Sequence, residues 1–501
     1  MLGVEVPPTV AFDYPSISAL AKFIEDEYAT PLKIDDRIQG DVDDLLGSDG
    51  QIFVRSIGSR LPGPGADAAG GSVAGLVGFG RDPVTTVPRD RWDIDDHFDP
   101  SGDNHVASYT RFGGFCDGVF LFDASTFGLS AQEARWLDPQ IRMLLEDHAS
   151  HISPQSHRGT DVVVGIFVGC MYHEYLSDVS KTGSSVPPPH AVIGNGAAYM
   201  AGRISFTYGT TGPSVCTDTA CSSSLVSCHL ASKSLRLHET ALNAVSGVNL
   251  MLAPSTTSAI CHLKALSSYG RCLTFSADAD GYGRAEASVV MTLAGRAAAR
   301  GAGGVIAGAF SDGDTGIGTG IEGAICELRA SNINQDGRSS GLTVPNGPAQ
   351  SSLLSSARAR GGLAAADVVA LSTHGTGTPL GDPIEVSAIQ KSYERGARTT
   401  LLSSKSSVGH CEGAAGLVGL LFALDFLLSK EESAIAHLRQ MNPFVSQSLH
   451  GWKTPHAVNR QPSCLIGGEG AVTGCSSFGM SGIDAHALLG TREHGASVFA
   501  G

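Results

Sequence analysis

The sequence lacks the features that mark secreted and membrane-embedded proteins. Residues 1–8 have no basic start and no apolar core, so they do not resemble a signal peptide. The most apolar stretch, residues 414–428, is shorter than a membrane span and contains Asp425. We therefore expect a cytoplasmic protein without membrane association, in which residues 414–428 form a buried helix.

Paired cysteines and an excess of positive charge are also missing. The 11 cysteines of the 501-residue chain show no CxxC pairs, which argues against a zinc site or a disulfide framework and favours reduced thiols. A formal net charge of −15 argues against nucleic-acid binding, which usually requires a basic face. With 42% hydrophobic and 17% charged residues, the composition is that of a globular protein.

The chain divides into a short leading segment, a linker, a main domain and a tail. Residues 1–30 contain a short amphipathic helix after the N-cap candidate Ser16, and the following residues to 50 are polar and acidic. We place the linker at 31–50, the main domain at 51–490 and the tail at 491–501.

Strand-like and helix-like segments alternate inside the main domain. Residues 161–169 and 368–371 read as buried strands, and 223–237 and 413–428 as helices. This alternation predicts a layered α/β fold with parallel strands and with catalytic residues at the strand ends. The glycine-rich run 301–323 contains a GxG but no convincing preceding strand, so we interpret it as a surface loop.

Cys221 is the candidate nucleophile. It lies among the small residues Ala220, Ser222 and Ser223, which allow a substrate to approach the sulfur. Because the helix over 223–237 starts immediately afterwards, its dipole is expected to favour the thiolate.

Two histidines lie in turns rich in small residues. His374 follows the strand at 368–371 and precedes Thr376 and Thr378, while His410 ends a segment that begins at Lys405. Lys405 is placed to orient the His410 imidazole, and Asp382 to cap the helix after the first turn. A cysteine with two imidazole partners indicates acyl transfer through a thioester.

These residues occur together with several longer motifs. The chain resembles, from about Gln51 to Leu489, the β-ketoacyl synthase (ketosynthase) domains of modular type I polyketide synthases, and less closely those of fatty acid synthases. Residues 1–30 are similar to the last helix of an acyl carrier protein domain. The supporting motifs are Leu137-Asp138-Pro139-Gln140-Ile141-Arg142, Gly202-Arg203-Ile204-Ser205, Asp280-Gly281-Tyr282-Gly283-Arg284, Asn334-Gln335-Asp336-Gly337-Arg338 and Ser476-Ser477-Phe478-Gly479-Met480-Ser481-Gly482.

The resemblance implies an α/β thiolase fold and usually a homodimer. Two pseudo-symmetric βαβαβ halves, at about 51–295 and 324–490, would form α/β/α/β/α layers. Cys221 would accept an acyl group from a carrier phosphopantetheine, and His374 and His410 would support decarboxylation of a malonyl carrier and stabilise the enolate. The enolate would then attack the acyl group and lengthen it by two carbons.

Further roles follow from the same resemblance. The backbone amides of Cys221 and Phe478 would form the oxyanion hole, and Phe478 would gate the acyl pocket. Lys405 would support His410, and Thr376 and Thr378 would contact the pantetheine. No cofactor or metal would be bound by the domain itself, because substrates arrive on the phosphopantetheine of acyl carrier proteins. An acyltransferase in another domain or in trans would load the extender unit.

The sequence departs from the family pattern at four places. Ser372 stands where the family usually has Glu, Ser276 where Asp is common and Asp484 where Asn is usual, and a helix around 146–152 is expected to be shortened to 147–151. The alternatives are a non-elongating transacylase or decarboxylase, a degenerate scaffold domain and a cysteine hydrolase. The presence of both His374 and Cys221 favours the condensing enzyme.

Overall fold

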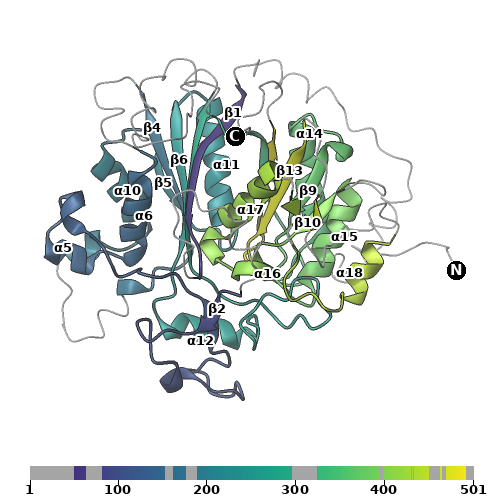
Figure 1. The fold of residues 1–501 in the computed structure, drawn as a ribbon, viewed down its shortest axis with the longest axis horizontal. Coiled ribbons are helices and arrows are strands. Elements are labelled where there is room, and N and C mark those ends of the chain that lie inside the picture. Colours follow the sequence, from purple (N-terminus) through teal and green to yellow (C-terminus); the bar gives the residue numbers. More distant parts are fainter. Residues whose placement is uncertain are drawn as a thin grey trace.

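The structure is a computed structural model that describes residues 50–63, 82–152, 162–176, 189–295, 324–393, 399–429, 431–432, 434–450, 463–464 and 470–491. Its main feature is a ten-stranded mixed sheet with helices between its two halves and outside them (Figure 1). The carrier-like segment 1–30, the linker before Gly50 and the glycine-rich run 301–323 lie outside the described residues, so those predictions stay untested.

The sheet consists of two halves with the same internal order. The first half runs β5-β4-β6-β7-β1 and the second β10-β9-β13-β14-β8, so the strands of each half take equivalent places. This confirms the two pseudo-symmetric halves. The strands are β1 (Ile52–Arg60), β4 (Val164–Gly169), β5 (Ser214–Thr217), β6 (Leu242–Asn249), β7 (Ala287–Gly295), β8 (Cys326–Gln335), β9 (Val368–Ser372), β10 (Thr400–Leu402), β13 (Val472–Phe478) and β14 (Ile483–Gly490).

The expectation of parallel strands is wrong for part of the sheet. β4 is parallel to β5 and β6, and β9 is parallel to β10 and β13. The remaining pairs, including β6 with β7 and β13 with β14, are antiparallel. The loop between β13 and β14 spans only residues 479–482, and so short a connection can join only antiparallel strands.

Helices complete a five-layered arrangement (Figure 1). One outer layer contains α5 (Ala131–Trp136), α6 (Pro139–Ala149) and α10 (Ala197–Tyr208); the central layer contains α11 (Ser223–Arg236) and α17 (Ala415–Ser429); the other outer layer contains α14 (Gly347–Arg360), α15 (Gly381–Tyr393) and α18 (Pro443–Ser448). The shorter elements are β2 (Val84–Thr86), β3 (Phe112–Gly114), α9 (Pro189–Ile193), α12 (Pro254–His262), α16 (Lys405–Val408), β11 (Glu431–Glu432), β12 (Ser463–Cys464) and the 3-10 helices η2 (Ile94–His97), η3 (Ala124–Phe127), η7 (Ala365–Asp367) and η8 (Glu412–Ala414).

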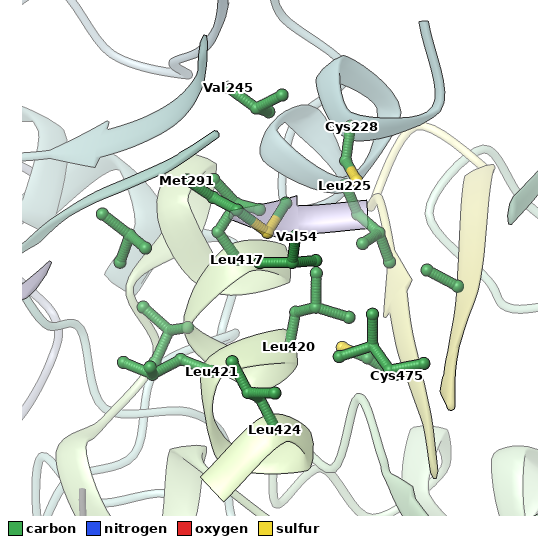
Figure 2. Close-up of a cluster of buried hydrophobic side chains, with 14 of the residues drawn as sticks. Val54, Leu225, Cys228, Val245, Met291, Leu417, Leu420, Leu421, Leu424 and Cys475 are labelled. Atoms are coloured by element: carbon green, nitrogen blue, oxygen red, sulfur yellow. The ribbon is translucent and has the colours of Figure 1, made fainter. Parts of the chain in front are cut away.

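The central helix α17 is the apolar segment noted in the sequence. Residues Glu412–Ser429 are long and apolar enough to span a membrane, yet 83% of this stretch is buried inside the protein. Leu417 and Leu420 lie in the same cluster as Leu225 of α11 and Cys475 of β13 (Figure 2). Each fully buried leucine contributes on the order of 1.5–3 kcal/mol to folding, so α17 is a core helix, as expected.

The segment 147–151 forms no separate short helix. Its first three residues complete the last turn of α6, which ends at Ala149. Arg60 of β1 binds this turn, with its Nη2 2.9 Å from Glu146 and its Nε 2.7 Å from Asp147. The altered sequence therefore still forms the end of this helix, and Arg60 pairs with its last turn.

The close approach of α11 to the sheet requires a glycine in β4. A Cβ at Gly169 would lie 2.4 Å from the backbone nitrogen and Cα of Ser224, at the start of α11. Because both atoms belong to the backbone, no side-chain rotation can relieve this contact. The first turn of the helix that follows Cys221 thus rests directly on the strand.

We expect Gly169→Ala to destabilise the protein by about 1–3 kcal/mol, because the added methyl group overpacks this backbone contact. The measurement is the free energy of unfolding in urea. Gly202→Ala is the matched control, since a Cβ at this exposed position of α10 meets nothing within 4 Å. Removing a helical glycine there should stabilise the protein by up to about 1 kcal/mol. Equal effects of the two substitutions would contradict the argument.

Candidate active site

The predicted site residues come from the carboxyl ends of strands in both halves. Cys221 follows β5, His374 follows β9, His410 follows β10 and the short helix α16, and Phe478 ends β13. All four side chains line one cavity of about 520 Å³, together with Thr376 and Thr378. The tertiary structure therefore brings together six of the seven predicted residues.

Cys221 lies at a strained turn. Ala220 has a φ of 58°, in the left-handed region, and its amide donates to Asp218 Oδ1 at 3.0 Å. On the other side, Ser477 Oγ donates to the Cys221 carbonyl at 2.7 Å. The cysteine is 5% exposed and immediately precedes Ser222, the N-cap of α11. These contacts fix the sulfur at the cavity wall.

The expected shift towards the thiolate is not found, because the surroundings of Cys221 favour the neutral thiol. Burial, followed by the negative charge of Glu412, raises the pKa of this thiol, which is about 12. Lys405 and hydrogen bonds from the backbone amides of Met480 and Cys221 itself lower this pKa but do not offset burial. The thiol therefore keeps its proton until a substrate is attacked.

The two histidines face each other across the cavity. Their ring centroids are 5.6 Å apart and the rings are nearly perpendicular, at 88°. The Phe478 amide donates to His374 Nδ1 at 3.2 Å, and the Glu412 amide donates to His410 Nδ1 at 3.1 Å. Since each Nδ1 accepts a hydrogen bond, the proton of each neutral ring is on Nε2.

Both imidazoles are neutral at physiological pH. Burial lowers the pKa of His374 and of His410 well below the usual range, and the charge of Lys405 lowers both further. Nε2 of His410 is buried and has no hydrogen-bond partner among the residues that the structure describes. An unpaired buried donor is costly, so this atom is placed for an acceptor on a ligand.

The turn after His374 is held by two buried carboxylates that the sequence analysis did not assign to it. Glu385 accepts hydrogen bonds from the amides of His374 and Gly375, at 2.6 and 2.8 Å. Asp382 accepts from the amides of Phe275 and Gly377, at 2.7 and 3.1 Å. The Asp382 side chain thus reaches back to earlier loops, and its expected role as a helix cap is wrong.

Glu412 orients His410 and was also missed. Its carboxylate accepts two hydrogen bonds from Arg284, at 2.8 and 2.9 Å, and one from Asn249 Nδ2 at 3.1 Å. Its backbone is in the left-handed region, with a φ of 42°, and this places its amide on His410 Nδ1. The ring of Tyr282 packs against His410 with centroids 4.9 Å apart.

The role of Lys405 in orienting His410 stays a prediction. It is 2% exposed and starts α16, and the described contacts of the His410 ring come from Glu412 and Tyr282. Lys405 acts on the site through its charge, which lowers the pKa of His374, His410 and Cys221.

The role of the Phe478 amide in the oxyanion hole stays a prediction; in this structure the amide donates to His374 Nδ1 at 3.2 Å. The backbone amide of Met480, two residues later in the same motif, lowers the pKa of the Cys221 thiol. The Phe478 ring lies 5.4 Å from the His374 ring and lines the cavity, and its role as a gate stays a prediction.

The departures from the family pattern leave the catalytic side chains in place. Ser372 is fully buried in β9, and Ser276 Oγ accepts from the Asp278 amide at 3.2 Å and donates to the Gln440 carbonyl at 3.4 Å. Asp484 is 1% exposed and lines the cavity. Across the described part of the chain, no group of three or more His, Cys, Asp or Glu residues is arranged to hold a metal ion.

Comparison with known proteins now identifies the class of enzyme. Residues 50–299 match the family description "Beta-ketoacyl synthase, N-terminal domain" and residues 325–438 match "Beta-ketoacyl synthase, C-terminal domain". The chain belongs to the β-ketoacyl synthase family, and it is a ketosynthase of the polyketide synthase type.

Individual relatives agree with this assignment. The chain is 36% identical to erythronolide synthase EryA3 of Saccharopolyspora erythraea over 97% of its own length and 15% of that protein. It is 35% identical to pikromycin polyketide synthase component PikAII of Streptomyces venezuelae, covering 97% of this chain and 13% of that one. The chain thus spans only a small part of these relatives. The oxazolomycin ketosynthase domain OzmH KS7 of Streptomyces albus JA3453 has a TM-score of 0.76 at 29% identity, covering 89% of this chain and 75% of that chain.

Replacing Lys405 by Met should raise the pKa of both histidines, because the lysine charge now lowers them. The rate of malonyl-thioester decarboxylation falls as the histidines become protonated at low pH, and this fall should therefore occur at higher pH in the variant. Decarboxylation rates measured between pH 5 and 8 provide the test, with circular dichroism to verify folding. The control is Lys391→Met, an exposed lysine of α15. If the rate falls at the same pH in both variants, the Lys405 charge does not act on the imidazoles.

Proposed function

We propose that this chain catalyses decarboxylative condensation of an acyl group on Cys221 with a malonyl-type carrier thioester, which lengthens the acyl chain by two carbons. The observation that carries the proposal is the convergence of one thiol and two neutral Nε2–H imidazoles on a single cavity. Thioester exchange needs a thiol nucleophile, and enolate formation needs donors aimed at a carbonyl oxygen.

The first half-reaction transfers the acyl group to the enzyme. The Cys221 sulfur attacks the acyl carbonyl carbon of the donor thioester, and the donor thiol leaves with the proton that the cysteine gives up. The amides of Met480 and Cys221 are the donors near the sulfur, so we assign to them the negative oxygen of the tetrahedral intermediate.

The second half-reaction forms the carbon–carbon bond. Hydrogen bonds from His374 Nε2 and His410 Nε2 to the malonyl thioester oxygen would stabilise the enolate that remains when CO2 leaves. The enolate carbon then attacks the acyl group on Cys221; the carbon–sulfur bond breaks, and the sulfur takes up one proton from water. Neutral imidazoles suit this role, because they donate hydrogen bonds without surrendering a proton to the enolate.

The partners follow from the same chemistry. We propose that acyl carrier proteins deliver both substrates on phosphopantetheine, whose arm passes Thr376 and Thr378 at the cavity wall. The extender unit would be loaded by an acyltransferase elsewhere in the assembly or in trans. The similarity of residues 1–30 to the end of a carrier domain supports a place within a multidomain synthase.

Intact-mass analysis with an acyl thioester donor tests the first half-reaction. We expect an acyl adduct on the wild type and none on Cys221→Ala, followed by loss of the adduct and release of β-ketoacyl product when malonyl carrier is added. An adduct that persists after malonyl carrier is added would instead identify a non-elongating transacylase. Absence of an adduct on folded wild-type protein would overturn the proposed function.

Substitution of either histidine tests the second half-reaction. His374→Ala and His410→Ala should still form the Cys221 adduct, but each should lower malonyl decarboxylation by about 10²–10³-fold, as loss of one oxyanion donor does. Release of CO2 from labelled malonyl thioester gives the rate. The exposed His105→Ala serves as the control. Unchanged decarboxylation in both active-site variants would remove the histidines from this step.

We further propose that the enzyme is a homodimer paired along β5. This strand is the last in the sheet order, and its first two residues are exposed. Phe206 of α10, which packs beside β5, is 81% exposed, and Val192 of α9 is 59% exposed. An open strand edge beside apolar side chains favours a second copy of the same surface, related by a twofold axis.

Phe206→Glu combined with Val215→Lys should convert the dimer to a monomer, because both charges would be buried in the pairing surface. Size-exclusion chromatography with light scattering measures the mass. Leu342→Glu, at a position 83% exposed in the second half of the chain, should leave the mass unchanged. A wild type that is monomeric at micromolar concentration would contradict the proposal.

A further inference from the structure

The cavity that contains Cys221 has a buried end and an exposed end. Cys221 is 5% exposed and Thr376 is 8% exposed, whereas Leu380, in the same turn as Thr376, is 43% exposed. Leu263, in the segment that follows α12, is 62% exposed and also lines the cavity. Leu263 and Leu380 therefore mark the mouth through which a substrate enters.

Backbone hydrogen bonds connect the two sides of this mouth. The Gly281 amide donates to the Gly377 carbonyl at 3.2 Å, and the Tyr282 amide donates to the Ala265 carbonyl at 3.0 Å. The segment that follows α12 thus lies beside the turn that carries the two threonines, with residues 281–282 between them.

This segment contains Lys264, the single lysine or arginine among the described residues that line the cavity. Lys264 is exposed, and within the described part of the chain it forms no ion pair with a carboxylate. The exposed carboxylate of Asp280 also lines the cavity, but it accepts hydrogen bonds from the amide and the hydroxyl of Ser268, at 3.1 and 2.9 Å. The other acidic residues of the lining are Asp336, Asp382, Glu385 and Asp484.

The ammonium group of Lys264 is held in place from two sides. Its Nζ lies 5.3 Å from the centroid of the Tyr109 ring, and a Cβ at Gly102 would lie 3.3 Å from it. Tyr109 is itself fixed, because its hydroxyl donates to the Leu266 carbonyl at 2.8 Å. The mouth of the cavity therefore presents an ordered positive charge without a partner.

The backbone of Lys264 is also unusual. Its φ of 53° is in the left-handed region, at the second residue after α12, where glycine is the favoured residue. A lysine in this conformation costs free energy, so strain at the mouth of a substrate cavity points to a use for its side chain.

We propose that Lys264 binds the phosphate of the phosphopantetheine arm while the thioester at the other end of the arm reaches Cys221. The inference rests on the proposed function and names the residue that recognises the charged end of the substrate. An ammonium pairs favourably with a phosphate, and at the exposed mouth the phosphate also stays hydrated. Deeper in the cavity the phosphate would be desolvated among acidic residues.

Two acyl donors that differ only in the phosphate test the proposal. Acylation of Cys221 is measured with an acyl phosphopantetheine thioester and with the acyl pantetheine thioester. In the wild type, the half-saturating concentration of the phosphorylated donor should be lower by about two- to fivefold at low ionic strength, as for one exposed ion pair. This advantage should shrink with added salt and disappear in Lys264→Met, while the maximal rate stays unchanged.

Two further variants separate charge from structure, because a lysine after a helix end can also stabilise the helix. Lys264→Arg should keep the advantage of the phosphorylated donor. Lys391→Met, at an exposed lysine outside the cavity lining, should behave as the wild type. If Lys264→Met weakens both donors equally, or if the wild type shows no preference, the proposal is overturned.

The same phosphate occurs on acyl carrier proteins and in coenzyme A. Carrier-bound and coenzyme A-bound acyl donors are therefore compared in the wild type and in Lys264→Met. A higher half-saturating concentration of the carrier-bound donor in the variant supports the proposal. An effect on the coenzyme A donor alone would contradict a site for the carrier arm.

Binding without chemistry separates this inference from the proposed function. Ligand-observed NMR compares the binding of unacylated phosphopantetheine and pantetheine to Cys221→Ala, with and without Lys264→Met. A preference for phosphopantetheine that requires Lys264, together with no acylation of the folded wild type, would overturn the proposed function and leave the phosphate site supported. Normal acylation with equal binding of the two ligands would reject the phosphate site alone.

Discussion

The ion pair between Arg284 and Glu412 is the interaction on which the active site depends. Both side chains are buried, and the guanidinium donates two hydrogen bonds to the carboxylate. Breaking such a pair on one side typically costs about 3–5 kcal/mol, because an uncompensated charge remains buried. The pair fixes the strained backbone of Glu412, and this backbone in turn fixes the tautomer and orientation of His410. One electrostatic contact thus sets which nitrogen of a catalytic ring faces the cavity.

Desolvation then decides the protonation state of each group around the cavity. It keeps the Cys221 thiol and both imidazoles neutral, and it raises the pKa of the carboxyls of Asp382, Glu385 and Asp484. The site is therefore prepared to donate hydrogen bonds from neutral groups, which is what thioester and enolate oxygens require.

Several parts of this arrangement could be predicted from local sequence. The cysteine and both histidines that the structure gathers at one cavity, and the apolar core helix, were each singled out from residue type and pattern, and the motifs specified the thiolase fold with two halves. The errors share a physical cause. The all-parallel strands and the Asp382 cap both depended on which backbone groups meet in space, and sequence pattern does not contain that information. Glu385 was missed because its carboxylate accepts hydrogen bonds from backbone amides, and Glu412 because its own backbone amide donates to His410. Such backbone contacts leave no local signature in the sequence.

The sequence by itself determined the chemistry available to this protein, since only Cys221 and the two histidine turns combine a nucleophile with imidazole donors in small-residue loops. Tertiary structure decided how that chemistry is arranged. Pairing of two equivalent five-stranded halves around α11 and α17 brings strand ends from both halves to one cavity. The groups around this cavity are buried only when segments from both halves pack together. This burial sets the charges of the thiol, the imidazoles and the carboxyls. Function follows from these fixed distances and low polarity, because hydrogen-bond strength and ionisation both depend on surroundings that only the folded chain creates.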